Sequence, residues 1–200
     1  MKAEESRDND RFRLAPNGVP WERYFPWWSK REEARKLPRA DRLQYLIDFL
    51  EEQPRREDLS ISHFGSYLMS TGKDMFHMGH WCRLGVFTFK TRWVFGKPSP
   101  PVLKREFEDS PHVCGTSGCA AGWTVMLFGD FSPMELYWRA EMATPGWEWQ
   151  REAANLLGVV SEYGDRIFVK ESEKGEDYAL RSLKHLRDHK VPLHDRPRKE

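Results

Sequence analysis

Three cysteines and seven histidines are the residues of this chain that could carry covalent or metal chemistry. Two of the cysteines bracket the segment Cys114-Gly-Thr-Ser-Gly-Cys119, which precedes an apolar stretch. Its glycines permit backbone angles that other residues avoid, and Thr116 or Ser117 can cap a following helix by accepting a backbone N–H bond. The segment therefore predicts a tight turn into a helix. Cys119 would lie in the first helical turn, where the positive end of the helix dipole favours a thiolate.

The first chemical interpretation of this turn is a cysteine nucleophile. Cysteine hydrolases place their thiol at a helix N-terminus and pair it with a histidine. Cys119 has that expected position, and His112 or His185 would be the base. The alternative is a small buried cysteine that fills a close helix contact, and we favour it because nothing downstream indicates a sheet that would carry the histidine. A disulfide between Cys114 and Cys119 is a further alternative.

The second chemical interpretation is a zinc site, because zinc accepts mixed cysteine and histidine ligands. Two short clusters supply the donors. The candidate ligands are His77, His80, Cys82, His112, Cys114 and Cys119. Their spacing follows no zinc-finger pattern, so neither a metal nor any other cofactor is the favoured expectation.

Several short sequence motifs occur in a recognisable order along the chain. They are Met75-Phe-His-Met-Gly-His-Trp81, Cys114-Gly-Thr-Ser-Gly-Cys-Ala-Ala-Gly-Trp123, Leu127-Phe-Gly129, Ala154-Asn-Leu-Leu-Gly158 and Arg166-Ile-Phe168. In this order they resemble a group of small uncharacterised bacterial and bacteriophage proteins with the pattern F-x-M-x-x-W, C-G-T-x-x-C-x-x-G-W-A, L-F-G, L-G and L-F. The motif residues that we expect to be structural are Trp81, Cys114, Gly115, Thr116, Cys119, Gly122 and Trp123. The resemblance implies a phage or mobile-element origin and no activity.

The elements that must position these residues are mostly helical. Apolar residues at helical spacing and Gly or Pro punctuation predict helices over 29–37, 39–53, 60–69, 120–128, 133–142, 147–157 and 176–189. Gly129 fits a helix C-cap, and Ser132-Pro133 fits an N-cap followed by a first helical residue. Only the β-branched and aromatic stretch over 83–95 indicates strands. The prediction is a mainly α (α+β) fold, a compact helical domain with a small β-hairpin or two-stranded element near 84–95.

Length and composition indicate one globular domain over 21–190, between a flexible N-terminal arm over 1–20 and a charged C-terminal tail over 191–200. Acidic and basic residues nearly cancel, at a net charge of +1, so a nucleic-acid partner is not favoured. No apolar run approaches the roughly 20 residues of a membrane span, and an odd, small number of cysteines is untypical of a secreted disulfide scaffold. We therefore expect a protein of the bacterial cytoplasm.

No phosphate-binding loop, HExxH, GxSxG or dinucleotide motif is present in the sequence. The leading hypothesis is a non-enzymatic protein-binding protein of phage or mobile-element type, acting on a host factor or defence system or as part of a virion. The alternatives are a thiol hydrolase that uses Cys119 and a small zinc-stabilised domain. The aromatic residues Trp21, Trp27 and Trp28 would form the contact surface, unless they pack in the core.

Overall fold

The computed structural model is mainly helical, as predicted, and it describes residues 13–15, 18–54, 74–76, 83–84, 116–141, 148–160, 163–164, 168 and 175–190. Within these ranges there are six α-helices and one 3-10 turn. The helices are α2 (Trp27–Lys36), α3 (Arg39–Glu52), α6 (Ala120–Phe128), α7 (Pro133–Glu141), α8 (Trp149–Leu157) and α10 (Glu176–His189). The 3-10 turn η1 spans Trp21–Arg23. All six helices lie where apolar periodicity predicted them; the helix predicted over 60–69 lies outside the described residues.

The helix boundaries follow from local chemistry. Ser132 and Glu135 form a reciprocal capping box at the start of α7, in which the Ser132 hydroxyl accepts the Glu135 N–H at 3.3 Å and Glu135 Oε2 accepts the Ser132 N–H at 2.8 Å. Gly158 ends α8 in the left-handed region, with φ of +70°, which glycine adopts without steric cost. Pro38 separates α2 from α3. The predicted cap at Ser132 is therefore confirmed.

The C-cap predicted at Gly129 works by a different mechanism. Its φ is −76°, so the left-handed conformation typical of glycine caps is not used. A Cβ built at this position would lie 2.5 Å from the carbonyl oxygen of Val125 and 2.9 Å from the ring of Phe131. Glycine is required here because there is no room for a side chain.

A three-stranded sheet joins the middle of the chain to the helices. Its order is β1 (Met75–Phe76), β3 (Thr116–Gly118) and β2 (Arg83–Leu84), with β1 parallel and β2 antiparallel to the central strand. Residues 83 and 84 thus form a strand, whereas the rest of the predicted strand segment, residues 85–95, lies outside the described residues. Because β3 leads directly into α6, the sheet sets where that helix begins.

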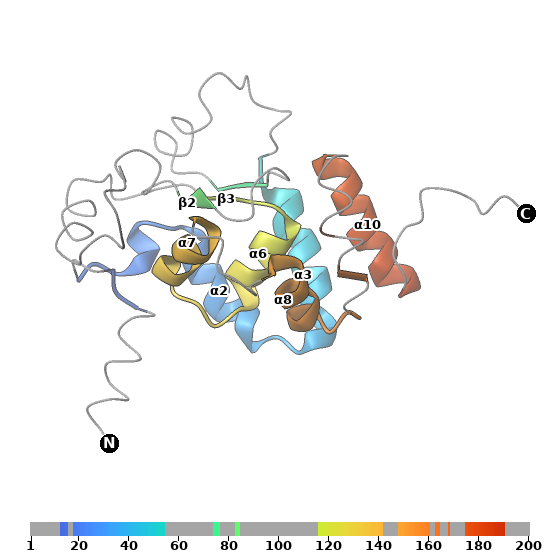
Figure 1. Cartoon of the computed structure of the whole chain (residues 1–200), viewed down its shortest axis with the longest axis horizontal. Coiled ribbons are helices and arrows are strands. Elements are labelled where there is room, and N and C mark those ends of the chain that lie inside the picture. The colour runs from blue at the N-terminus through green and yellow to red at the C-terminus, as the bar shows by residue number, and fades with distance from the viewer. Residues whose placement is uncertain are drawn as a thin grey trace, which may run out of the picture.

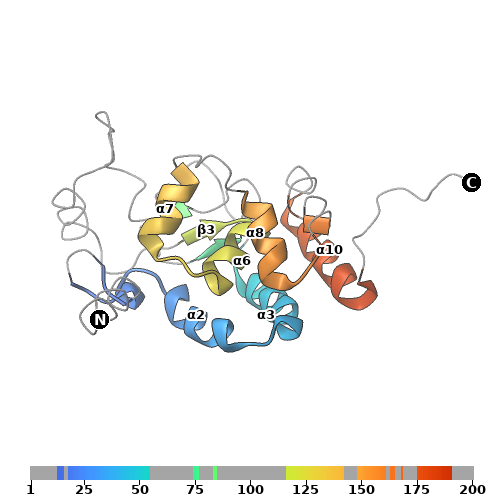
Figure 2. The same ribbon diagram turned by 60° about the horizontal axis from the view of Figure 1, so that its bottom comes forward.

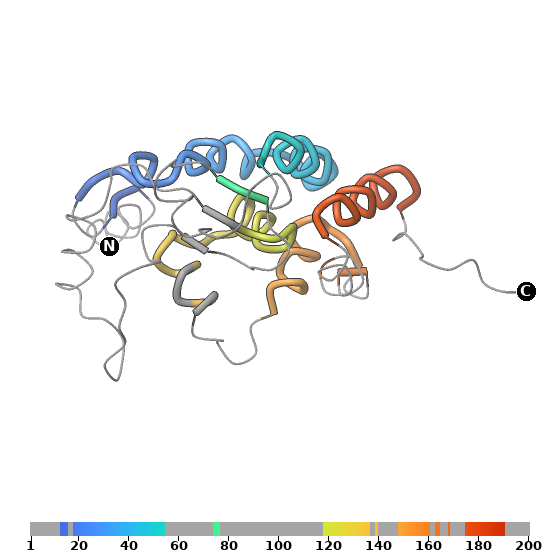
Figure 3. The backbone as a smooth tube through the Cα atoms, turned by 90° about the horizontal axis from the view of Figure 1, so that it is seen from above, coloured from blue at the N-terminus to red at the C-terminus, as the bar shows by residue number. Residues whose placement is uncertain are grey.

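Helix α6 is the centre of the fold. It packs against α2, α3 and α8, and each of its residues is buried. Figures 1 and 2 show this helix enclosed by its neighbours, and Figure 3 shows α2 and α3 running end to end along one side with α10 beyond them. The predicted amphipathic helices lie around a helix that is apolar on every face.

The predicted flexible arm over 1–20 is partly described, and the described part is folded. Leu14 and Pro20 form an antiparallel bridge, the Ala15 N–H donates to the Val19 carbonyl at 2.8 Å, and Ala15 is buried in the core. Gly18 takes a φ of +80° within this loop. Residues 13–15 and 18–20 therefore belong to the globular part of the chain.

Candidate functional site

Cys119 lies at the junction between β3 and α6. It is the N-cap of α6, and its Sγ accepts the Gly122 N–H at 3.4 Å. The caps expected at Thr116 or Ser117 are therefore wrong, because both residues belong to strand β3 and the backbone turns into the helix only after Gly118. The thiol takes the position of the cap that a serine or threonine would usually occupy.

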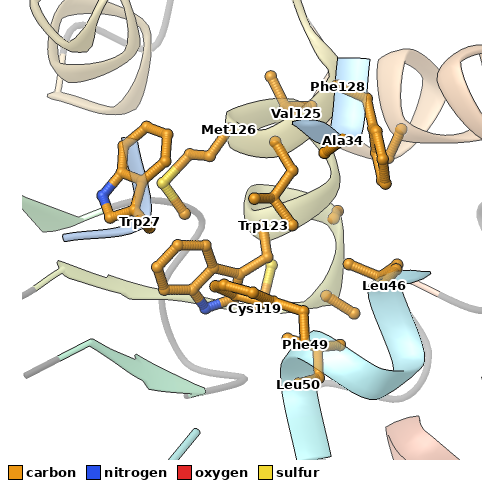
Figure 4. Packing of buried hydrophobic residues seen from close by; sticks show 14 of the residues in the cluster. Trp27, Ala34, Leu46, Phe49, Leu50, Cys119, Trp123, Val125, Met126 and Phe128 are labelled. Carbon is orange, nitrogen blue, oxygen red and sulfur yellow. The ribbon is translucent and has the colours of Figure 1, made fainter. Parts of the chain in front are cut away.

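The thiol of Cys119 is buried and protonated. The side chain is 2% exposed, and burial raises its pKa from 9.0 to about 11, in spite of backbone hydrogen bonds that favour the thiolate. Desolvation thus outweighs the helix dipole that the sequence indicated. Figure 4 shows the sulfur beside Trp123 and close to Phe49 and Leu50 of α3. Cys119 is a free thiol, and its surroundings agree with the packing interpretation rather than with a nucleophile or a disulfide.

The predicted histidine partners do not complete a catalytic pair within the described part of the chain. His185 is half-buried on α10, and its ring lies 4.3 Å from that of His189 one turn later. No histidine among the described residues hydrogen-bonds to Cys119. His112 lies outside those residues.

The zinc ligands that the sequence suggested cannot be brought together from the described residues. Of the six candidates only Cys119 is described, and no group of three or more His, Cys, Asp or Glu side chains gathers for a metal within the described ranges. The other five are outside those ranges, as are the motif residues Trp81 and Gly115. The described motif residues Gly122 and Trp123 are fully buried in α6.

The tryptophans proposed as a contact surface pack in the core. Trp21, Trp27 and Trp28 are each at most 1% exposed. The ring of Trp27 meets that of Trp28 edge-on at 5.3 Å and that of Trp123 at 5.9 Å. The alternative of core packing therefore describes these residues, and a contact surface has to be sought elsewhere.

Five of the six basic residues between 30 and 42 lie in three different environments: exposed ion pairs, the core, and the junction of α3 with α8. Lys30 and Arg35 form exposed ion pairs with Glu52 and Asp130, each at 3.0 Å. Arg31 is fully buried, and its guanidinium donates to the Gly129 carbonyl at 2.7 Å.

The remaining two arginines lie on α3, at the end of the molecule where three helices meet. Arg42 donates to the Leu156 carbonyl at 3.0 Å and so caps the last turn of α8. The aliphatic part of Arg39 lies close to Gly158. A Cβ built on Gly158 would be 3.6 Å from Arg39 Cδ. These contacts hold the start of α3 against the end of α8.

A groove of about 450 Å³ opens at this junction, between the start of α3, the end of α8 and the end of α10. Its floor is formed by Leu43, Leu157 and Leu186, which are nearly fully buried, and Tyr163 is half-buried at its side. Val160 stands at the edge with 61% of its surface exposed, one of two large apolar side chains exposed in the described residues. Figure 1 shows α3, α8 and α10 lying together at this end.

The charge at the groove is positive. Arg39 and Lys190 line it, and no acidic side chain among the described residues does so. Neither cation has an ion-pair partner in the described structure, unlike Lys30, Arg35, Arg151 and Lys184. Burial and then the like charges of Arg39 and Arg35 lower the pKa of the neighbouring Arg42. A concave site in which the described residues supply an apolar floor and a few charged groups is typical of a binding site.

Sequence reasoning identified the components of this groove but not the groove itself. Its lining residues lie on or next to the helices that the sequence predicted over 39–53, 147–157 and 176–189. Their convergence depends on how three helices pack, and no local motif signals it.

Comparisons of the chain with protein-family models, with curated proteins and with solved structures found no significant match in any of the three.

Proposed function

We propose that this chain is a non-enzymatic protein-binding protein that contacts its partner through the groove between α3, α8 and α10. The observation that carries the proposal is the groove's composition: a floor of buried leucines, the exposed Val160 and two cations that have no ion-pair partner among the described residues. Ligand sites are typically concave and combine apolar surface with a few placed polar groups, and this groove has both.

The chemistry of Cys119 supports a role without catalysis. A nucleophilic cysteine needs a thiolate and access to its substrate. The raised pKa and the burial of this thiol oppose both requirements. No observation on the described residues favours the thiol hydrolase or the zinc-stabilised domain over a binding protein.

The biological setting of the proposal rests on the sequence. A phage or mobile-element origin, with a bacterial host protein or a phage protein as partner, rests on the resemblance of its motifs. A location in the bacterial cytoplasm is part of the same proposal. Within the described ranges, no helix combines the length and apolar character needed to cross a bilayer.

Affinity capture from bacterial lysate tests the proposed function. The full chain is compared with Val160→Asp, which places a charge at the apolar edge, and with Arg181→Gln, which removes an exposed cation of α10 outside the groove. We expect the wild type and Arg181→Gln to capture the same protein and Val160→Asp to lose it. Specific capture that Val160→Asp leaves unchanged, or no specific capture by the wild type, would contradict the proposal.

A further inference from the structure

The side chains that line the groove between α3, α8 and α10 indicate which kind of partner segment it would bind. Its cations stand on two sides, with Arg39 in the first turn of α3 and Lys190 immediately after α10. Lys190 has a φ of +59°, and its N–H donates to the Leu186 carbonyl at 2.8 Å, so the helix end fixes its backbone. Exposed positive charge therefore lies on two sides of an apolar floor.

The floor itself selects for apolar side chains. Leu157 and Leu186 are 6% and 4% exposed, and together with Leu43, Val159 and Val160 they give the groove more apolar than polar surface. The aliphatic stem of Arg39 extends this surface against Gly158. A volume near 450 Å³ falls in the range of known ligand pockets, about 300–1,000 Å³.

We propose, on the basis of the proposed binding function, that the groove accepts an acidic peptide segment whose apolar side chains enter the floor while its carboxylates face Arg39 and Lys190. Charge complementarity is the argument for this occupant. A nucleic acid would satisfy the cations but has no aliphatic side chains for the floor. The chain's own tail over 191–200 is a poorer match, since it carries Arg196, Arg198 and Lys199 against two acidic residues.

Fluorescence anisotropy with three matched peptides tests this proposal on the full chain. The peptides share an apolar core of leucine and phenylalanine and differ in their flanks, which are glutamate, glutamine or lysine. We expect the glutamate peptide to bind about tenfold more tightly than the glutamine peptide, because it gains two exposed charge contacts. The lysine peptide should bind most weakly. Raising the salt from about 0.05 M to about 0.5 M should remove most of the difference.

A charge exchange separates specific recognition from general attraction. In the double variant Arg39→Glu and Lys190→Glu, the preference should reverse, so that the lysine peptide binds best. The matched control Arg181→Gln should keep the wild-type preference, because this exposed cation lies outside the groove. Circular dichroism melting of each variant verifies that the fold is retained, which the exposure of Arg39 and Lys190 favours.

Several results would overturn the proposal. These are equal affinity for the three peptides, no binding of any of them, or an unchanged preference after the charge exchange. Binding that is seen only after residues 191–200 are removed would identify the tail as the occupant and would also overturn it. If the peptides fail while lysate capture still depends on Val160, only the partner class is wrong; if both fail, the proposed function falls too.

Discussion

The guanidinium of Arg31 on α2 donates a hydrogen bond to the carbonyl of Gly129 at 2.7 Å, across 98 residues of sequence. A second bond, to the Phe131 carbonyl, measures 3.3 Å, and the side chain stacks 4.4 Å from the ring of Trp28. The loop between α6 and α7 is thus attached to α2 by a buried cation, whose pKa burial lowers to about 10. Arg31 is therefore a structural element of the core.

Replacing Arg31 with methionine should destabilise the protein by about 1–3 kcal/mol, because the buried carbonyl of Gly129 loses a charged donor. The matched control is Arg35→Met, which breaks an exposed ion pair with Asp130 and should cost no more than about 1 kcal/mol. Urea unfolding of both variants measures the difference. Equal stability of the two variants would contradict the structural role of Arg31.

Trp123→Phe tests the connection between α6 and the sheet. The indole Nε1 of Trp123 donates to the Met75 carbonyl at 3.0 Å in a fully buried environment. Phenylalanine keeps an aromatic ring but leaves that carbonyl without this donor, so we expect a loss of about 1–3 kcal/mol. Hydrogen exchange at the Phe76 amide should become faster, because that N–H, bonded to the Pro54 carbonyl, lies in the same strand. An unchanged exchange rate would show that the bond does not support β1.

Two glycines allow a comparison between lack of space and backbone conformation. Gly129→Ala should lower the stability of the fold more, by about 1–3 kcal/mol, because the new Cβ would meet a backbone oxygen at 2.5 Å. Gly158→Ala meets only ordinary contacts, but its φ of +70° costs a side chain about 1–2 kcal/mol. Thermal melting of the two variants ranks them. A larger loss for Gly158→Ala would mean that the loop after α6 can move to make room.

The pKa of Cys119 gives the stability of the fold a specific dependence on alkaline pH. Above pH 9.0 the unfolded thiol ionises, whereas the folded thiol keeps its proton up to about pH 11. The unfolded state therefore binds fewer protons in this interval, and stability should fall by about 2–3 kcal/mol as the pH rises from about 9 to 11. Cys119→Ala should lack this component. If the free energy of unfolding of both proteins fell equally as the pH rises over this range, the raised pKa of Cys119 would be contradicted.

Alkylation offers a direct measure of the reactivity of Cys119. Near neutral pH we expect iodoacetamide to modify this residue at least about 100-fold more slowly in the native protein than in the unfolded one, since the thiol is buried and protonated. Peptide mass spectrometry resolves Cys119 from Cys82 and Cys114. Rapid and selective native labelling at Cys119 would instead support the thiol hydrolase.

The sequence alone determined the helical character of the protein and the bounds of several helices. Apolar periodicity located α3 and α10 to within about a residue, and Ser132 with Pro133 marked the start of α7. These features depend on residues close together in the chain, through helical spacing and caps. That is why sequence patterns suffice to find them.

Only the tertiary structure decided what the chemically informative residues do. The dipole expected at Cys119 is outweighed by desolvation, which arises because the thiol is buried in the hydrophobic core. Trp27, predicted as a contact residue unless it packs in the core, is buried because other segments cover it. The groove between α3, α8 and α10 joins Arg39, Val160 and Lys190, which are far apart in sequence. Burial and convergence depend on the packing of distant segments, and no local pattern contains them.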